Sequence, residues 1–246
     1  MIDNKQGLIF ANNVALNSNN QTISNQNTLS EKQDKGIIAL NSLVLTTDLL
    51  NNDKGNIFSR NKTVINTNLL LQNTGLITAN IVNLVSQVIR SNQNSEISGQ
   101  QVNVKSQTLD NKGSKLIAHQ MAHIDVKQGV QNYNGTLASL GKVLSINTHQ
   151  SELNNAGGMI AVQNGTLKLE TNKLDNQQGV IRAHTADITA VQSVDNRNTL
   201  ADIAQGIVVT DLMLKTKQLD NQAGRITSFN QAMLQVLISE IKQVKS

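Results

Sequence analysis

The amino-acid sequence predicts an all-β solenoid, in which short strands wind into stacked coils of roughly twenty residues. Three observations predict it: one phrase recurs down the whole chain, its aliphatic residues are spaced by two, and its turns are rich in asparagine and glycine. The clearest copies read LDNKGSKLIA from Leu109, LDNQQGVIRA from Leu174 and LDNQAGRITS from Leu219. A fixed period of this length indicates one supersecondary unit stacked on its own copies.

The asparagine of the phrase marks the coils. Eleven copies occur along the 246 residues, so we expect about eleven coils in one repeat segment that spans residues 1–246. The copies lie at Asn4, Asn25, Asn52, Asn73, Asn92, Asn111, Asn132, Asn155, Asn176, Asn196 and Asn221. Longer spacings after Asn25 and after Asn196 predict loop insertions at Asn27–Lys35 and Leu200–Gly206.

The aliphatic positions predict strands rather than helices. Two positions before the asparagine, ten of the eleven copies carry Ile, Leu or Val, and Arg90 is the exception. A second aliphatic column, five positions after the asparagine, includes Leu116, Leu137, Ile160 and Ile181. The next inward position, two residues further on, is usually small, and a step of two is the period of a strand. Each coil should therefore hold two or three short strands separated by turns.

The turns combine asparagine with glycine. Glycine follows the asparagine by three positions in six copies and by two positions in two copies. We expect a positive φ at this corner, which glycine adopts without steric cost. The asparagine side chain can cap its own turn, and in stacked coils asparagines can also bond one another along the column. The turn positions to which we assign this structural role are Asn4, Asn52, Asn111, Asn155, Asn176, Asn221, Gly7, Gly55, Gly158, Gly179 and Gly224.

The composition limits the class of protein. Aromatic residues make up 2% of the chain, which fits a thin aliphatic core, and proline and cysteine do not occur. A chain without proline suits continuous strand ladders, and a chain without cysteine is compatible with secretion. The net charge of +4 is spread along the chain, so we expect no nucleic-acid partner. No apolar stretch reaches the length of a bilayer span, so we expect no membrane insertion.

An aspartate column is the strongest candidate for an active site. Asp175, Asp195 and Asp220 precede the asparagine in consecutive copies. Stacked coils lie about 4.8 Å apart, so three such carboxylates could bind Ca²⁺ or act as an acid/base pair on a polysaccharide. Alternatively they cap the turn, as Asp3 and Asp110 would do in other copies. Because the residue belongs to the repeat phrase itself, we favour capping and expect no catalytic residue, no metal site and no cofactor.

The histidines are weaker candidates. His119 and His184 occupy equivalent positions, but two coils lie between them, so they should be too far apart to share a metal. His119 and His123 are four residues apart, a spacing that pairs ligands on a helix but not on a strand. His149 and the other three should be solvated surface residues. No serine within Gly-x-Ser-x-Gly and no phosphate-binding glycine loop occurs, so we expect a protein that is not an enzyme.

The phrase LDNxxGxIxA, followed by alternating aliphatic residues, resembles the repeat of filamentous haemagglutinins. These are large exoproteins of bacterial two-partner secretion, and they include adhesins and contact-dependent growth inhibition effectors. The resemblance extends from Ile2 to about Ile238 and departs at the two insertions. It implies a right-handed parallel β-helix, export through an outer-membrane transporter partner, and display as a fibre on the bacterial cell surface.

These features together predict a non-catalytic, rigid stalk segment of a secreted exoprotein. The chain begins inside a repeat and ends just beyond one, so we expect a piece of a longer protein whose flanking β-helix coils continue the rod. Its role would be adhesion, or the presentation of a contact-dependent inhibition toxin. One alternative is a direct adhesin segment whose insertions contact a receptor or glycan on a target cell. Another is a glycan-active β-helix enzyme or a phage tail fibre.

Overall fold

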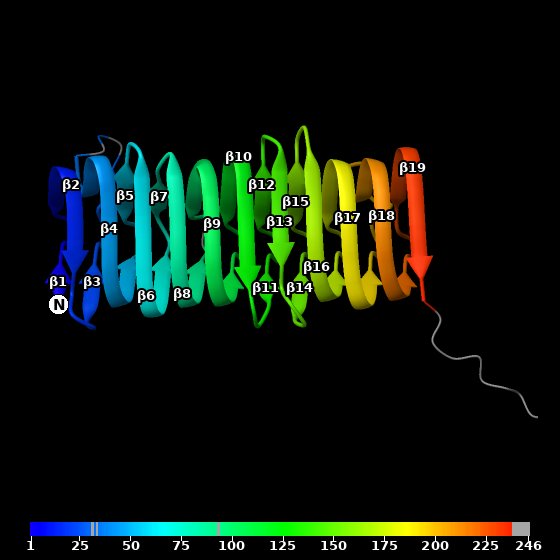
Figure 1. Cartoon of the computed structure of the whole chain (residues 1–246), viewed down its shortest axis with the longest axis horizontal. Helices are drawn as coiled ribbons and strands as arrows, with labels where there is room; N and C mark the ends of the chain where they lie inside the picture. Colours follow the sequence, from blue (N-terminus) through cyan, green and yellow to red (C-terminus); the bar gives the residue numbers. More distant parts are fainter. Residues whose placement is uncertain (31, 33, 93, 238–246) are drawn as a thin grey trace, which may run out of the picture.

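The computed structural model describes residues 1–30, 32, 34–92 and 94–237 (Figure 1). These residues form nineteen β-strands and no helix, and all the strand pairings are parallel. The strands are β1 (Ile2–Asp3), β2 (Leu8–Asn17), β3 (Thr22–Ser24), β4 (Gly36–Asn52), β5 (Asn56–Ser59), β6 (Lys62–Asn73), β7 (Leu76–Thr78), β8 (Ile81–Ser91), β9 (Glu96–Asp110), β10 (Lys115–Val126), β11 (Val130–Gln131), β12 (Thr136–Ser139), β13 (Val143–Asn147), β14 (Glu152–Asn154), β15 (Met159–Val162), β16 (Thr166–Asp175), β17 (Val180–Asp195), β18 (Gly206–Asp220) and β19 (Ile226–Val236). The predicted parallel β-solenoid is thereby confirmed.

The winding is right-handed. In Figure 1 the near strands, such as β13, run downwards and the strands behind them run upwards while the chain advances from left to right. Coils are 18 to 27 residues apart, as shown by the separations of Asn73 from Ser91 and of Asn25 from Asn52. The rod is therefore long and of nearly constant cross-section, with the asparagine turns along one edge.

Each coil contributes a strand segment to each of three faces, and the strands β11, β12 and β13 form one such coil. Face A holds the segments that lead into the asparagine turn, such as β11, which pairs with β9 and β14. Face B follows the turn and holds β12, which pairs with β10 and β15. Face C holds β13, which pairs with β10 and β16. Longer strands such as β17 run through the corners and serve all three faces.

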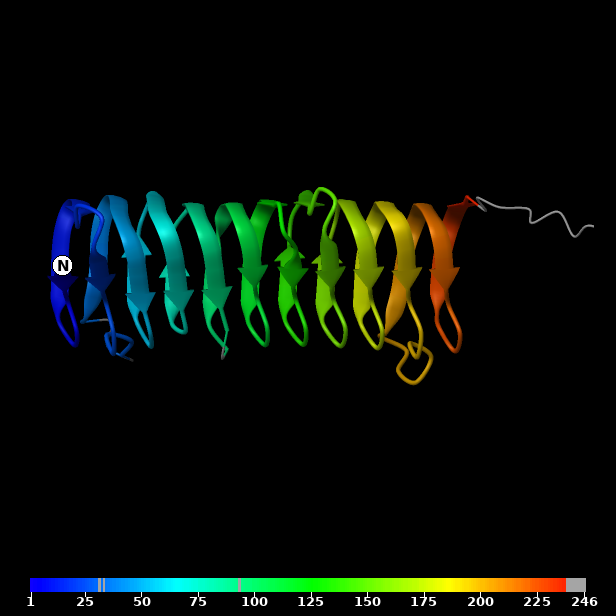
Figure 2. The same ribbon diagram turned by 90° about the horizontal axis from the view of Figure 1, so that it is seen from below.

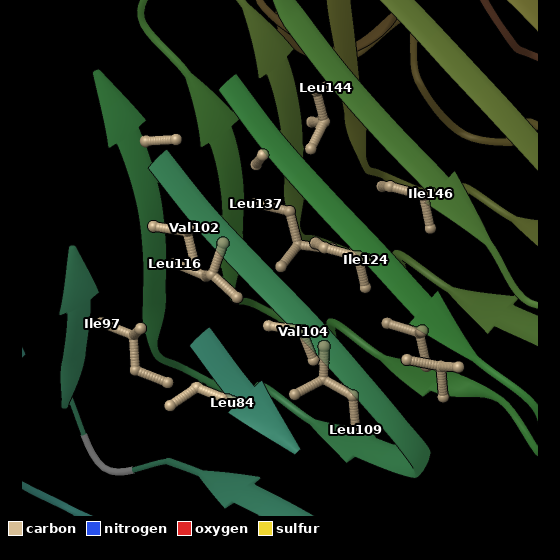
Figure 3. Close-up of a cluster of buried hydrophobic side chains, with 14 of the residues drawn as sticks. Leu84, Ile97, Val102, Val104, Leu109, Leu116, Ile124, Leu137, Leu144 and Ile146 are labelled. Atoms are coloured by element: carbon tan, nitrogen blue, oxygen red, sulfur yellow. The ribbon is translucent and has the colours of Figure 1, made fainter. Parts of the chain in front are cut away.

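The core consists of aliphatic columns that run the length of the rod. The predicted column is confirmed, since Leu116 pairs with Leu137, Leu137 with Ile160 and Ile160 with Ile181, and all four are fully buried. Figure 3 shows Leu116 and Leu137 pointing into this core together with residues of face C such as Ile124. All four aromatic residues lie instead on the surface, with exposed fractions from 38% to 74%: Phe10, Phe58, Tyr133 and Phe229.

Both predicted insertions are loops, and both project from the edge that carries the asparagine turns (Figure 2). One joins β3 to β4 and the other joins β17 to β18, with Gly206 already in β18. Glu31 and Gln33 of the first insertion lie outside the described residues, and so does the segment from Ile238 onwards.

Candidate functional site

The repeated asparagines form a buried hydrogen-bonded ladder at the corner between faces A and B. The Nδ2 of Asn132 donates to the Oδ1 of Asn155 at 2.7 Å, and Asn155 donates in the same way to Asn176 at 2.7 Å. The ladder has two runs, which are Asn4, Asn25, Asn52 and Asn73, and then Asn111, Asn132, Asn155, Asn176, Asn196 and Asn221. Every bond points in the same direction along the rod, so neighbouring amides polarise and strengthen one another.

The same amide also closes its own turn and holds the next coil. Asn155 Nδ2 donates to the carbonyl of Gly158 at 3.3 Å and to the carbonyl of Val180, in the next coil, at 3.3 Å. The N–H of Gly158 in turn donates to the carbonyl of Asn155 at 2.9 Å. One buried side chain thus satisfies groups in its own coil and in the coils on both sides.

The expected positive φ is wrong for the glycines three positions after the asparagine, although it holds at Gly113, two positions after Asn111, where φ is +61°. The left-handed conformation belongs to the preceding residue in most copies, including Gln6, Lys54, Gly157, Gln178 and Ala223. Gly55, Gly158, Gly179 and Gly224 are needed for a different reason, because a Cβ there would come within 3.0 Å of a carbonyl oxygen in the preceding coil. At Gly7 it would meet the side-chain oxygen of Asn4 instead. This close approach depends on a residue about one coil away, which local turn rules do not reveal.

One ladder position differs from the prediction. Ser91, and not Asn92, stands in the column, since it pairs with Asn73 and accepts a hydrogen bond from Asn73 Nδ2 at 3.2 Å. The buried Ile89 fills the aliphatic position, and Arg90, where counting from Asn92 places that position, is exposed. The turn after Ser91 contains an extra residue, so counting from asparagine alone shifts the register by one.

Separate pairs of buried hydroxyls, which the sequence reasoning missed, lie at the corner between faces C and A. Buried pairs include Ser18 with Thr47 at 2.8 Å and Thr148 with Thr171 at 2.8 Å. The signal for these pairs is present in the sequence, because each of the four residues follows the last inward-facing aliphatic residue of face C by two positions. The strand period therefore continues inwards with a small polar residue at this corner.

The aspartates of consecutive coils do form a column, as Asp175 pairs with Asp195 and Asp195 with Asp220. Each carboxylate accepts the backbone N–H two residues further along, at distances of 3.0, 3.2 and 3.1 Å respectively. The same bond occurs at Asp3 and Asp110. This geometry is that of an Asx-type cap, in which the carboxylate closes the start of the turn.

Among the described residues, Arg197 is the cation that pairs with this column. Arg197 binds Asp195 through two bonds, Nε to Oδ1 at 2.9 Å and Nη2 to Oδ2 at 2.7 Å, and its Nε lies 3.4 Å from Asp220 Oδ2. Partial burial raises the pKa of Asp195, but the hydrogen bonds and charge of Arg197 outweigh this effect and hold that pKa below its usual value. The hydrogen bond to Asp195, followed by its charge and those of Asp220 and Asp175, raises the pKa of Arg197.

We expect the stability due to this pair to depend on pH. A carboxyl whose folded-state pKa is lowered stabilises the fold above its unfolded pKa of about 3.9, and the contribution is lost as the pH falls through the folded value. Arg197→Gln should therefore lower the urea midpoint at pH 7, and the difference from wild type should shrink by pH 2 to 3. Arg182→Gln, which removes a cation that bonds a carbonyl, is the control. An Arg197→Gln difference that stays constant with pH would contradict the assignment.

The histidines do not converge. His119 and His123 both lie on β10 and His184 lies on β17. His149 forms an exposed pair with Asp125, with 2.5 Å between Nε2 and Oδ1, which the sequence reasoning did not foresee. Within the described ranges, no three His, Cys, Asp or Glu side chains lie together in a way that could hold a metal ion.

No protein-family model matches this chain, and no curated protein and no solved structure is significantly similar to it. Among the residues that the structure describes, no helix is long and apolar enough to cross a membrane.

Proposed function

We propose that this chain is a non-catalytic, rigid stalk segment of a secreted exoprotein of the filamentous haemagglutinin kind. The observation that carries the proposal is the asparagine ladder, in which buried amides such as Asn132, Asn155 and Asn176 tie each coil of a run directly to the next. Backbone ladders on three faces and continuous aliphatic columns act in parallel with it. A rod built in this way resists bending, and its length is set by the number of coils.

Five positions of the phrase can be assigned to the turn or to the stacking of coils. In the copy at Leu174, the leucine and Ile181 point into the core, Asp175 caps the turn, Asn176 joins the ladder and Gly179 allows the coils to approach. The carboxylates that an enzyme would need are engaged with backbone N–H groups and with Arg197. This use of the phrase supports a stalk over a glycan-active enzyme.

In this proposal the far end of the rod carries the part that binds a target cell or kills it. The rod holds that part away from the producing bacterium. The partners are the flanking coils of a parent chain and an outer-membrane transporter. A chain with no cysteine and no proline suits export, because it crosses the membrane unfolded without disulfide or slow isomerisation traps. It can then fold coil by coil on the cell surface.

Calorimetric titration with Ca²⁺ tests whether the aspartate column is only structural. We expect no binding to the wild type or to the Asp175→Asn, Asp195→Asn, Asp220→Asn triple variant, which keeps its capping oxygens. Neither protein should cleave polysaccharides of bacterial or host origin. Tight Ca²⁺ binding that is lost in the variant would overturn the stalk proposal for this face. The adjacent gene tests the family, since it should encode an outer-membrane transporter rather than a tail-assembly protein.

A direct adhesin is the second candidate, and the loop Leu200–Gly206 favours it. Ile203 at its tip is 81% exposed, while Arg225 Nη1 donates to the carbonyl of Ile203 at 3.1 Å and Arg182 Nη2 donates to that of Ala204 at 3.3 Å. An apolar side chain held out on an anchored loop suits contact with a partner. Binding to target cells that is abolished by Ile203→Ser would favour the adhesin, whereas the stalk proposal expects neither protein to bind.

A further inference from the structure

The asparagine ladder is interrupted between Ser91 and Asn111. Asn111 Nδ2 donates to Asn132 Oδ1 at 2.8 Å, to the carbonyl of Thr136 at 3.1 Å and to the carbonyl of Ser114 at 3.2 Å. These three bonds fix the orientation of the amide. Its Oδ1 must then occupy the place where the other asparagines accept a bond from the preceding coil.

That oxygen has no donor among the described protein groups, although Asn111 is fully buried. The Oδ1 of Asn92, in the neighbouring turn, is likewise buried without a partner. Buried polar atoms are nearly always hydrogen-bonded, by protein or by ordered water. Two orphaned acceptors at one interruption of the ladder therefore require a donor.

The hydroxyls at the break cannot supply it. The polar atom of serine lies one bond closer to the backbone than the amide nitrogen of asparagine, and Ser91 Oγ already accepts from Asn73 and shares a proton with Ser95 Oγ at 2.9 Å. Ser95 Oγ shares a second proton with Ser114 Oγ at 2.5 Å, and Ser114 Oγ donates to the carbonyl of Ser95 at 3.2 Å. The three hydroxyl protons are thus all used within this serine cluster, which consists of Ser91, Ser95 and Ser114.

We propose that the break is a binding site for one structural water molecule, which takes the place of the missing asparagine amide between Ser91 and Asn111. The water donates one proton to Asn111 Oδ1 and has a second for Asn92 Oδ1 or a serine oxygen. Such a molecule makes about three hydrogen bonds to otherwise unsatisfied groups, as buried waters commonly do. The polar groups that define the site are amides and hydroxyls, which suit a neutral donor better than an uncompensated cation.

A water-mediated joint has a consequence for the rod. The asparagine amides of the run that ends at Asn73 and of the run that begins at Asn111 are coupled through serine hydroxyls and this water rather than amide to amide. Local opening should therefore be easiest here, and amide hydrogen exchange should be faster in the turns at 91–96 and 111–115 than in the turn at 155–159.

The test is a crystal structure of the whole chain at a resolution that shows ordered water, with thermal melts of the wild type and two variants. We expect a water within hydrogen-bond distance of Asn111 Oδ1 in the wild type. In Ser91→Asn it should be replaced by the new amide, and the melting temperature should rise by a few degrees. Ser91→Ala should lower it, and Ser145→Asn on the outside of face C should leave it unchanged.

Two outcomes would overturn the proposal. One is a structure in which Asn111 Oδ1 accepts a bond directly from a protein group of the preceding turn. The other is density typical of a cation, together with a melting temperature that rises in one of NaCl, KCl or CaCl₂ at matched ionic strength. A water site predicts the same melting temperature in all three salts.

Discussion

Replacing Ile181 with aspartate should lower the free energy of unfolding by more than about 4 kcal/mol, because it buries an unpaired charge. Ile181 is 0% exposed and lies in register between Ile160 and Ile207 in the aliphatic column. Urea denaturation followed by circular dichroism measures the change. Gln192→Asp, at an exposed position of the same strand, is the matched control and should be nearly neutral. Equal stability of the two variants would show that the register of face B is wrong.

Replacing Asn155 with leucine should cost about 3 to 5 kcal/mol, since four hydrogen bonds worth about 1 kcal/mol each are lost and two buried groups lose their partners. The lost bonds are those from Asn132 Nδ2 and those to Asn176 Oδ1, Gly158 O and Val180 O. Leucine has the same number and branching of side-chain heavy atoms as asparagine, so the change removes the hydrogen bonds without truncating the side chain.

The matched control for the ladder is Asn164→Leu, because Asn164 is exposed at the corner between β15 and β16. Its change in unfolding free energy should stay within about 0.5 kcal/mol. If Asn155→Leu cost no more than this control, the ladder would be incidental to stability and the rod would depend on its aliphatic core alone.

The architecture could be predicted from the sequence because the solenoid repeats one short-range rule. The period of two predicts which residues of each coil point inwards, and the repeat predicts that Leu116, Leu137, Ile160 and Ile181 form one column. The structure confirms their register. The ladder of asparagines follows from the same repetition, since identical residues in stacked coils must lie over one another.

The predictions from sequence are wrong or incomplete where the conformation of a turn depends on contacts with the neighbouring coil. The predicted register is wrong by one residue at Asn92. The turn there contains one extra residue, which changes the count from the asparagine but leaves the aliphatic column in place. Gly179 is required by the carbonyl of Asn155, which is 24 residues away, and not by its own φ. Arg197 pairs locally with Asp195, but its contact with Asp220 crosses coils, so no local motif indicates that contact. Contacts between coils depend on exact turn lengths, which the phrase leaves variable.

The most direct test of a rigid rod whose length is set by its coils is to duplicate residues 111–195. This segment contains four coils, from Asn111 to the residue before Asn196, and the copy would be inserted after Asp195. Coils spaced by about 4.8 Å should lengthen the rod by about 19 Å at unchanged cross-section. Small-angle X-ray scattering of both proteins measures the maximum dimension and the cross-sectional radius. A longer chain with an unchanged maximum dimension, or with a larger cross-section, would contradict the stalk.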